Sequence, residues 1–472
     1  MRIIDPTNGL RVPSEQPPFP VGPSSIAELW DRRPPDSVAV VDGERSWTTD
    51  ELRSEVDRVA RCLIAAGALP GDRIGWVVGD DVTSLVSLLA TLRINGWWAG
   101  VSSRAPEAER RALLDGIEPA LVLDTLPQGD PTIALPVAGG GAIAFTSGTT
   151  GRPKAVVHGE QQLLYPAAAA IETERLDEHS RIGTPLSLAT LNIVLLGPLT
   201  ALACGGTAVL LPRRDPEGLS ADIARHRVTR VLAVPTIVHD LAAAPVEPDR
   251  LATVHRIVLG GAGVDRERAR AAERTLGVRL VLSYGLSEAP TGVARMGLDE
   301  TGAAPLPGVS IELDDGEITL APTIDGAWAG CWQGTLGYWR DPEATAELWR
   351  DGRLHTGDAG QLDPDGRLLV TGRVGDMINR GGATIAPTEV ESTLLSLDGV
   401  IDAAVFGVDD ERLGQVVAAA VVGDVEPDVL RPLVRARLSG YKVPERWLVL
   451  DDLPRNANGK VDRNELRARL DA

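Results

Sequence analysis

The apolar and polar positions along the chain alternate between two periods. Between residues 49 and 67 apolar side chains recur every three or four positions, which is the spacing of one helix face, and Thr48 or Thr49 is the expected N-cap. A wholly apolar run follows at 73–78, and a second helical pattern at 82–94 stops at Asn95-Gly96. Such alternation of helix and strand predicts an open α/β sheet covered by helices.

The same alternation resumes beyond residue 200. Apolar runs at 207–211, 229–234, 256–259 and 279–282 are separated by helical patterns. Ligands of open α/β sheets bind beyond the carboxyl ends of the strands, so the segments that follow these runs are candidate binding residues. They are Pro235-Thr236, Gly260-Gly261-Ala262-Gly263 and Ser283-Tyr-Gly-Leu-Ser-Glu288.

From about residue 310 the pattern changes to short strands separated by Asp-Gly turns, which predicts a β-rich subdomain at about 310–372. A mixed pattern follows, with strand-like runs at 403–408 and 416–422. A chain of 472 residues also exceeds what one core usually supports. We therefore expect an α/β fold with a large N-terminal domain of layered sheets at 1–372 and a small α+β C-terminal domain at 377–472.

The composition excludes several classes of protein. The formal charge of −19 would repel nucleic acid and anionic lipid, so neither is an expected partner. No apolar run is long enough for a membrane span, and the N-terminus carries no secretion signal. The three cysteines are too scattered for a disulfide framework or a zinc site and suit a reducing compartment. A cytoplasmic protein is expected.

Lysine is rare in this chain. Of the 47 basic residues, 44 are arginine and three are lysine. A compact ammonium differs in shape from a planar guanidinium, so sites that need a point charge resist exchange for arginine. Lys154, Lys442 and Lys460 are therefore functional candidates, although an ordinary turn before a strand explains Lys442 equally well.

One stretch, from Ala142 to Val157, combines two apolar runs with a loop of hydroxyls and glycines between them, and predicts strand, loop, strand. Glycines let backbone N–H groups converge on an anion, and hydroxyls and an ammonium add donors. The spacing matches neither the Walker loop nor the dinucleotide fingerprint. Taken alone, the composition also fits an exposed hairpin connection. The candidate phosphate loop consists of Thr146, Ser147, Gly148, Thr149, Thr150, Gly151 and Lys154.

This loop resembles the signature loop of the adenylate-forming superfamily, which includes acyl- and aryl-CoA synthetases, adenylation domains of nonribosomal peptide synthetases, and luciferases. Further motifs similar to those of the family follow in the same order across nearly the whole chain. They are Ser283-Tyr-Gly-Leu-Ser-Glu288, His355-Thr-Gly-Asp358 with Gly372-Arg373, Gly381-Gly-Ala-Thr-Ile-Ala-Pro-Thr-Glu-Val-Glu391, and Pro454-Arg-Asn-Ala-Asn-Gly-Lys460. The resemblance implies the family's fold, in which the C-terminal domain moves about a hinge, here at 373–376.

The resemblance also implies how ATP and Mg²⁺ would be held. Tyr284 would offer its ring to the purine, Ser287 would bind the α-phosphate, and Glu288 would hold the magnesium. Asp358 would accept hydrogen bonds from both ribose hydroxyls, assisted by Arg373. The family's nucleotide site further includes the positions of Gly261, Ala262, Ser283 and Gly285.

Lys460 is the expected catalytic lysine, with Ser287 and Glu288 beside it at the phosphates. A carboxylate that attacks an α-phosphate brings two anions together, and a lysine that reaches both stabilises the transition state more than the ground state. The family's C-terminal domain swings between the two half-reactions about a hinge position that is Gly375 here. Gly381 and Gly382 would then line the tunnel for the thiol.

The acyl pocket of the family corresponds here to Leu188, Asn192, Gly261, Ala262, Ser283, Gly285 and Pro290. Several of these residues are small, which leaves room for a flat or bulky acid, and the absence of an aspartate between 184 and 196 disfavours an amino acid. The chain departs from the family at Ala155, Ala383 and Thr384. Leu188 also stands where many relatives have an aromatic or histidine gate, so the efficiency of thiol transfer stays open.

We therefore expect an enzyme that activates a carboxylic acid with ATP and Mg²⁺ and transfers the acyl group to CoA, as a monomer or homodimer, in specialised metabolism. Two alternatives stay open. In the first, the acceptor is the phosphopantetheine of an acyl carrier protein; in the second, the chain is a nucleotide-binding sensor without catalysis, against which Glu288 and Lys460 count. An acidic carrier or the phosphates of CoA would suit a basic cluster that a solvated helix face also explains: Arg431, Arg435, Arg437, Lys442 and Arg446.

Overall fold

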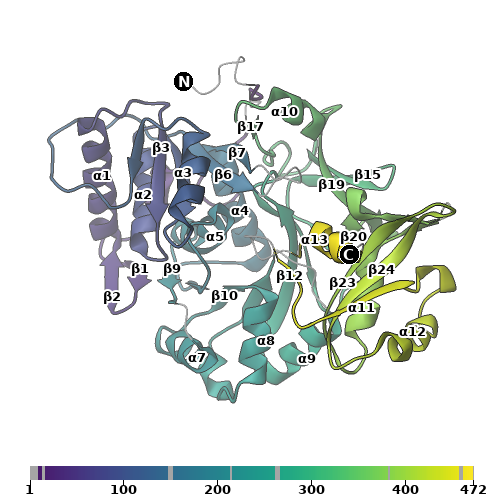
Figure 1. Ribbon diagram of the computed structural model, residues 1–472. Coiled ribbons are helices and arrows are strands. Elements are labelled where there is room, and N and C mark those ends of the chain that lie inside the picture. The colour runs from purple at the N-terminus through teal and green to yellow at the C-terminus, as the bar shows by residue number, and fades with distance from the viewer. Residues whose placement is uncertain are drawn as a thin grey trace. The chain divides into compact units, whose positions relative to one another are not determined.

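Parallel strands form the middle of the largest sheet in the computed structural model, which describes residues 9–12, 16–146, 153–212, 215–260, 266–380, 383–455 and 461–470 (Figure 1). The sheet has nine strands in the order β14-β13-β12-β11-β10-β8-β9-β1-β2, and the strands from β12 to β1 are all parallel. The strands are β1 (Val38–Asp42), β2 (Arg45–Thr48), β8 (Arg181–Thr184), β9 (Thr207–Leu210), β10 (Arg230–Ala233), β11 (Arg256–Leu259), β12 (Arg279–Leu286), β13 (Thr291–Gly297) and β14 (Ala304–Pro305). The predicted α/β fold is confirmed.

Helices separate these strands along the chain. They are α4 (Glu160–Glu174), α5 (Leu191–Val194), α6 (Thr200–Ala203), α7 (Pro216–Arg225), α8 (Pro235–Ala243) and α9 (Arg266–Leu276). A π-helical turn at Leu195–Leu199 joins α5 to α6.

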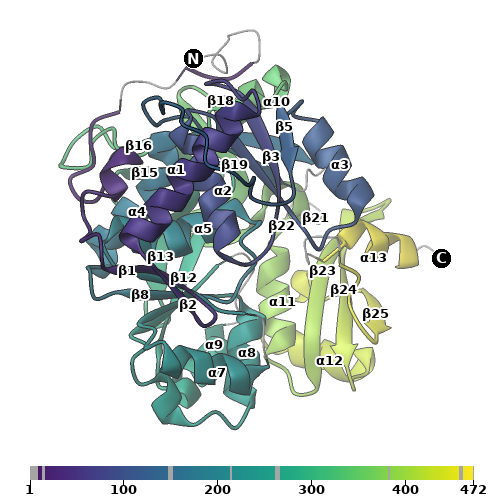
Figure 2. The ribbon, with the colours of Figure 1, turned by 90° about the vertical axis from the view of Figure 1, so that its left-hand side faces the viewer.

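A second sheet has six strands in the order β17-β7-β6-β4-β3-β5. In both ribbon views β3 lies between α2 and α3 (Figures 1 and 2). Successive side chains of a strand point to opposite faces, and Trp76 on β3 accordingly donates from Nε1 to Thr91 of α2, at 3.0 Å. The neighbouring Gly75 faces Leu114 of α3. The elements are α1 (Thr49–Ala65), α2 (Val82–Arg93), α3 (Glu107–Asp115), β3 (Arg73–Val78), β4 (Trp97–Ser102), β5 (Leu121–Leu123), β6 (Gly141–Thr146), β7 (Lys154–Gly159) and β17 (Gly337–Tyr338).

The first helix begins where its sequence predicts. Thr48 caps α1: its hydroxyl accepts from the Glu51 N–H at 3.2 Å, and the Glu51 carboxylate accepts from the Thr48 N–H at 2.8 Å. This reciprocal capping box satisfies two donors that the first turn would otherwise leave unpaired. The predicted apolar face is buried, with Leu52, Val59 and Leu63 all at 0% exposure.

The chain divides into two compact units. The first comprises Met1–Gly261, Ala271–Ile311 and Leu320–His355, and the second comprises Ala262–Arg270, Glu312–Thr319 and Thr356–Ala472. The domain boundaries expected at 372 and 376 stay a prediction. Among the described residues, no helix is both long and apolar enough to cross a membrane.

A third sheet follows the expectation of short strands from about residue 310. Its order is β15-β16-β19-β18, with β20 paired to β19. The elements are β15 (Val309–Asp314), β16 (Glu317–Pro322), α10 (Pro342–Leu348), β18 (Trp349–Arg350), β19 (Arg353–Leu362) and β20 (Leu368–Arg373).

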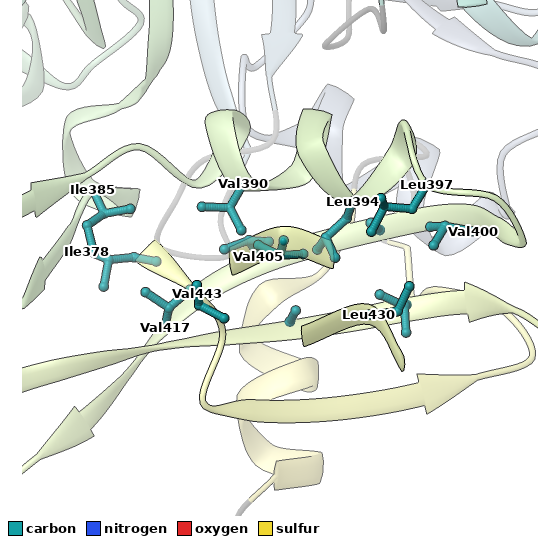
Figure 3. Close-up of a cluster of buried hydrophobic side chains, with 14 residues drawn as sticks. Ile378, Ile385, Val390, Leu394, Leu397, Val400, Val405, Val417, Leu430 and Val443 are labelled. Carbon is teal, nitrogen blue, oxygen red and sulfur yellow. The ribbon is translucent and has the colours of Figure 1, made fainter. Parts of the chain in front are cut away.

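The end of the chain folds around a fourth sheet, with the order β22-β21-β24-β23 and β25 paired to β24. Val390 and Leu394 of α11 face Val405 and Val417 of the sheet (Figure 3). On the other face, Phe406 packs with Leu466 of α13. The elements are β21 (Ile378–Arg380), β22 (Ala383–Ile385), α11 (Pro387–Leu395), β23 (Val400–Asp410), β24 (Gly414–Gly423), α12 (Pro427–Arg435), β25 (Arg446–Leu450) and α13 (Arg463–Leu470).

A buried ion cluster ties α4 to the nine-stranded sheet. Glu174, the last residue of α4, accepts two hydrogen bonds from Arg230 of β10, at 2.8 and 3.1 Å, and a further one from Arg295 of β13. Burial alone would raise the pKa of Glu174, but the positive charges of Arg230 and Arg295 outweigh it and lower the pKa to about 2. The carboxylate therefore stays ionised inside the unit.

A second link joins the two large sheets. His158 of β7, 1% exposed, lies with Nε2 at 2.7 Å from the carbonyl oxygen of Ser287, which follows β12. A carbonyl only accepts, so Nε2 carries the proton and donates it. Burial lowers the pKa of His158 to about 4, and the ring is therefore neutral near pH 7.

Replacing Glu174 with Gln should lower the free energy of unfolding by about 3–5 kcal/mol, because buried arginine charges lose their counter-charge. Urea unfolding followed by tryptophan fluorescence measures this, since every tryptophan except Trp447 belongs to the first unit. Glu172 is exposed on the same helix and provides the matched control, because E172Q should unfold as the unaltered protein does. Equal stability of E174Q and E172Q would contradict the prediction.

Stability should fall as the pH is lowered from about 7 to about 5, in part because of His158. The folded-state pKa of about 4 is below the usual 6.5, so the unfolded chain takes up a proton that the folded chain refuses. The contribution is present above about pH 6.5 and is lost toward pH 4, and it amounts to about 2 kcal/mol between pH 7 and pH 5.

The variant H158Q should therefore lose less stability than the unaltered protein over the same pH interval, measured by urea unfolding at each pH. H179Q removes an exposed ring and should keep the original pH dependence. An identical pH dependence in H158Q and H179Q would show that His158 does not contribute.

Candidate functional site

The two strands predicted on either side of the phosphate loop are present. Thr146 ends β6 and Lys154 begins β7, and the two residues are paired across an antiparallel hairpin. The Thr146 hydroxyl donates to the Lys154 carbonyl at 3.5 Å. The loop residues between them, Ser147, Gly148, Thr149, Thr150 and Gly151, lie outside the described residues.

A distant strand pairs with β7 and adds a tyrosine to this region. Register places Tyr338 of β17 opposite Val156 of β7. The ammonium of Lys154 lies 4.6 Å from the centroid of the Tyr338 ring. The Tyr338 hydroxyl donates to Oε1 of Glu288 at 2.9 Å. The structure therefore brings together the predicted loop lysine and the predicted magnesium carboxylate, which lie 134 positions apart in the sequence.

The turn that carries Ser287 and Glu288 is fixed at its backbone. The Ser287 carbonyl accepts from His158, at 2.7 Å, and the Glu288 carbonyl accepts from the N–H of Thr335, also at 2.7 Å. Two consecutive carbonyls are thus bound, one by a residue of β7 and one by a residue that precedes β17. Neither His158 nor Tyr338 was predicted as a site residue, because no local pattern marks them.

The close approach of β13 to the end of β12 accounts for Gly285 in this motif. A side chain at Gly285 would place Cβ 1.9 Å from the carbonyl oxygen of Thr291, so only glycine permits this approach of β13. Ser283 and Tyr284, both half-buried, precede it on the same strand. Among the described residues, the predicted Tyr284, Ser287 and Glu288 therefore occupy one strand end and its turn.

The other predicted acyl-pocket residues follow strands of the same sheet. Leu188 is buried in the segment after β8, where its N–H donates to Asp80 at 3.2 Å, and Asn192 is half-buried on α5. Pro290 is buried between β12 and β13. Since β8 and β12 belong to the same parallel set, their carboxyl ends share one edge of the sheet. Gly261 and Ala262, predicted at this edge too, lie outside the described residues.

The predicted ribose pair is formed in the second unit. Antiparallel register sets Asp358 opposite Arg373, and Oδ1 of Asp358 lies 2.8 Å from Nε of Arg373. The Asp358 N–H donates to the Thr356 hydroxyl at 3.0 Å, and that hydroxyl donates to the Ile318 carbonyl at 2.8 Å. The aspartate is therefore buried and fixed, with an arginine that is half-exposed beside it.

For the other predicted residues of the second unit, the structure gives the surroundings of only some. Gly375 lies in a short 3-10 turn at Val374–Asp376, and a Cβ there would meet nothing within 4 Å, so packing does not require glycine. Lys442 donates to both carboxylate oxygens of Glu389, at 2.6 and 2.7 Å. Gly381, Gly382 and Lys460 lie outside the described residues.

A cavity of about 230 Å³ lies elsewhere in the first unit. Its lining includes Ser180, Thr229 and His255, which directly precede β8, β10 and β11. It therefore lies at the amino ends of the parallel strands, the opposite edge from the predicted nucleotide and acyl residues.

Comparison with known proteins connects these features. The family model of AMP-binding enzymes matches residues 27–137 and 141–324, and the model of the AMP-binding enzyme C-terminal domain matches 389–460. A feruloyl-CoA synthase of Amycolatopsis sp is 32% identical over 93% of this chain and 97% of that protein.

Two solved structures are similar as well. ATP-bound MatB from Rhodopseudomonas palustris has a TM-score of 0.85 and 25% identity, covering 94% of this chain and 98% of that one. The amide bond synthetase McbA from Marinactinospora thermotolerans has a TM-score of 0.81 and 29% identity, covering 94% of this chain and 99% of that one. The chain therefore belongs to the family of AMP-binding enzymes, the adenylate-forming superfamily that its motifs resemble.

Proposed function

We propose that this AMP-forming carboxylate–CoA ligase activates an aryl or similarly bulky acid. The acid's carboxylate attacks the α-phosphate of ATP and pyrophosphate leaves, which forms an acyl-adenylate. The thiol of CoA then attacks the acyl carbon and AMP leaves. The observation that carries the proposal is the meeting of Lys154 and Glu288 at Tyr338, which assembles an ammonium and a carboxylate suited to phosphates and their metal.

Glu288 suits the magnesium that accompanies ATP. Tyr338 donates to Oε1, and no residue in the described part of the chain donates to Oε2. Magnesium prefers oxygen ligands and is commonly held by one or two carboxylates together with substrate phosphates. When bound, the ion would neutralise part of the phosphate charge. Since no group of three or more candidate metal ligands occurs among the described residues, phosphate oxygens and water would supply the other ligands.

Asp358 is the proposed acceptor for the two ribose hydroxyls. An ionised carboxylate has acceptor sites for both, and its backbone is held by Thr356. Arg373 balances the negative charge at 2.8 Å. Because Asp358 is already ordered, ATP binding costs little side-chain entropy at this position.

Lys460 is proposed to stabilise the charge that develops between the attacking carboxylate and the α-phosphate. This role follows from its motif and from the electrostatics of the step, since a positive charge that contacts both anions stabilises the transition state preferentially. No covalent intermediate with the enzyme is needed. Most of the rate enhancement would come from positioning and charge stabilisation.

The acid is proposed to be aromatic or similarly bulky. Small residues at 283 and 285 limit how far the end of β12 protrudes, and Leu188 supplies an apolar side chain where many relatives have an aromatic or histidine gate. The similarity to a feruloyl-CoA synthase supports an aromatic acid and CoA as acceptor. The chain is also similar to an amide bond synthetase, whose name indicates an acceptor other than a thiol. The acceptor of the acyl group is therefore tested directly, with and without CoA.

A carrier protein is the second candidate acceptor. The basic cluster proposed to meet it includes Lys442, but this lysine is already bound by both oxygens of Glu389. The pair neutralises one positive charge of the cluster, which weakens its attraction for an acidic carrier and for the phosphates of CoA alike.

Incubation with ATP, Mg²⁺ and a pooled panel of aromatic and aliphatic acids, with and without CoA, should yield AMP and acyl-CoA of an aromatic acid, identified by mass spectrometry. Acyl-adenylate that accumulates regardless of CoA would replace CoA with another acceptor. Absence of AMP under all conditions would overturn the ligase and favour a nucleotide sensor.

Lys460→Ala provides the control for that experiment. It should abolish acyl-adenylate formation and leave ATP binding largely intact, because the lysine is needed mainly in the transition state. Full adenylation activity of K460A would overturn the proposed mechanism.

Asp358→Ala should reduce kcat/KM for ATP by roughly 10- to 150-fold, since a hydrogen bond to a charged group contributes about 1.5–3 kcal/mol. The loss should largely vanish when 2′,3′-dideoxy-ATP replaces ATP, because the missing hydroxyls are the proposed partners. Asp365, exposed on the same β19–β20 hairpin, provides the matched control, and D365A should keep the original values with both nucleotides. An equal loss with both nucleotides would contradict ribose recognition.

A further inference from the structure

We propose that Tyr338 is a positioning residue that couples the magnesium carboxylate of Glu288 to the phosphate-loop lysine, Lys154. This inference rests on the roles proposed above for those two residues. The Tyr338 side chain contacts both of them, at 2.9 Å from its hydroxyl to Oε1 of Glu288 and at 4.6 Å from its ring centroid to Nζ of Lys154. At 7% exposure, it does so away from bulk water.

The hydroxyl contact orients the carboxylate. A glutamate side chain has several rotatable bonds, and fixing them costs free energy each time a metal binds unless a neighbour holds the group in place beforehand. The Tyr338 hydroxyl holds Oε1 and thereby fixes the orientation of the other carboxylate oxygen, Oε2. Partners that orient a metal ligand in this way usually affect metal affinity although they never touch the metal.

The ring contact restrains the lysine. An ammonium over the face of an aromatic ring is attracted by the ring's electrons, and the attraction is stronger where water is excluded. Lys154 begins β7 at the end of the phosphate loop, so its long side chain would otherwise have many conformations. The ring of Tyr338 limits them without neutralising the charge that the phosphates need.

The segment that carries Tyr338 is itself rigid. The Thr335 hydroxyl donates to the Val157 carbonyl at 2.7 Å, and the Trp339 N–H donates to the Ala155 carbonyl at 2.8 Å. The Thr335 N–H also binds the Glu288 carbonyl at 2.7 Å. Residues 335–339 therefore hold Glu288 at both its backbone and its side chain, and they are fixed to the same strand that begins with Lys154.

The test is equilibrium binding of ATP by calorimetry across a range of Mg²⁺ concentrations, without acid, so that no adenylate forms. Tyr338→Phe keeps the ring but loses the hydroxyl, and it should raise the Mg²⁺ concentration needed for half-maximal binding by about 10-fold. Its ATP affinity in the presence of EDTA should stay unchanged. An unchanged Mg²⁺ requirement in Y338F would overturn the proposal.

Tyr338→Leu removes the ring as well. This variant should show the Mg²⁺ effect of Y338F and in addition bind ATP several-fold more weakly in EDTA, because Lys154 loses its restraint. Equal affinity of Y338L and Y338F in EDTA would overturn the coupling to Lys154.

Tyr165→Phe is the matched control for a purely structural loss. Tyr165 is fully buried in the same unit, and its hydroxyl donates to the Pro307 carbonyl at 2.9 Å. The Y165F variant should lose thermal stability but keep the original Mg²⁺ requirement. A Mg²⁺ effect in Y165F equal to that in Y338F would show that any lost buried hydroxyl acts in this way, which overturns a specific role for Tyr338.

Glu288→Gln separates this inference from the function on which it rests. If ATP binding to E288Q no longer depends on Mg²⁺, while Y338F needs the original Mg²⁺ concentration for half-maximal binding, the positioning role fails and the metal role of Glu288 stands. If E288Q binds ATP with the original Mg²⁺ dependence, the proposed metal role itself fails, and the coupling through Tyr338 fails with it.

Discussion

The pairing of β17 with β7 is the contact on which the arrangement of the site depends. It joins residues about 180 positions apart and fixes Tyr338 opposite Val156. This register brings Tyr338 to both Lys154 and Glu288, although β7 and the turn that carries Glu288 belong to different sheets. Because a shift of one residue reverses the direction of every side chain in a strand, the backbone bonds of residues 335–339 determine whether the tyrosine faces the site.

Charge balance explains how a chain with a net charge of −19 can still bind a nucleotide. Long-range repulsion is screened by salt within about 8–10 Å, whereas groups in direct contact with the phosphates act at short range and with less water between them. Lys154 is the group proposed for this role. The buried cluster around Glu174 follows the same rule for the protein's own charges, because its carboxylate is buried only together with Arg230 and Arg295.

Much of the fold follows from local patterns in the sequence, and the site follows only in part. The α/β class, the capped helix after Thr48 and the parallel strands between 207 and 286 were predictable because period and capping are encoded by adjacent residues. The motif residues were identified by resemblance. Tyr338 and His158 could not be identified, because the role of each depends on a partner far away in the sequence. Tyr338 contacts Glu288 and His158 contacts Ser287, and no spacing rule predicts either contact.

Lysine is rare in this chain, and the structure describes the surroundings of two of the three lysines, Lys154 and Lys442. For Lys154 the structure supplies a reason for the point charge, since one compact ammonium lies over the Tyr338 ring and can still turn toward an anion. Lys442 is different. It contacts both oxygens of Glu389, a geometry that the guanidinium of arginine matches at least as well. The ion pair alone therefore does not account for lysine at this position in a chain with 44 arginines.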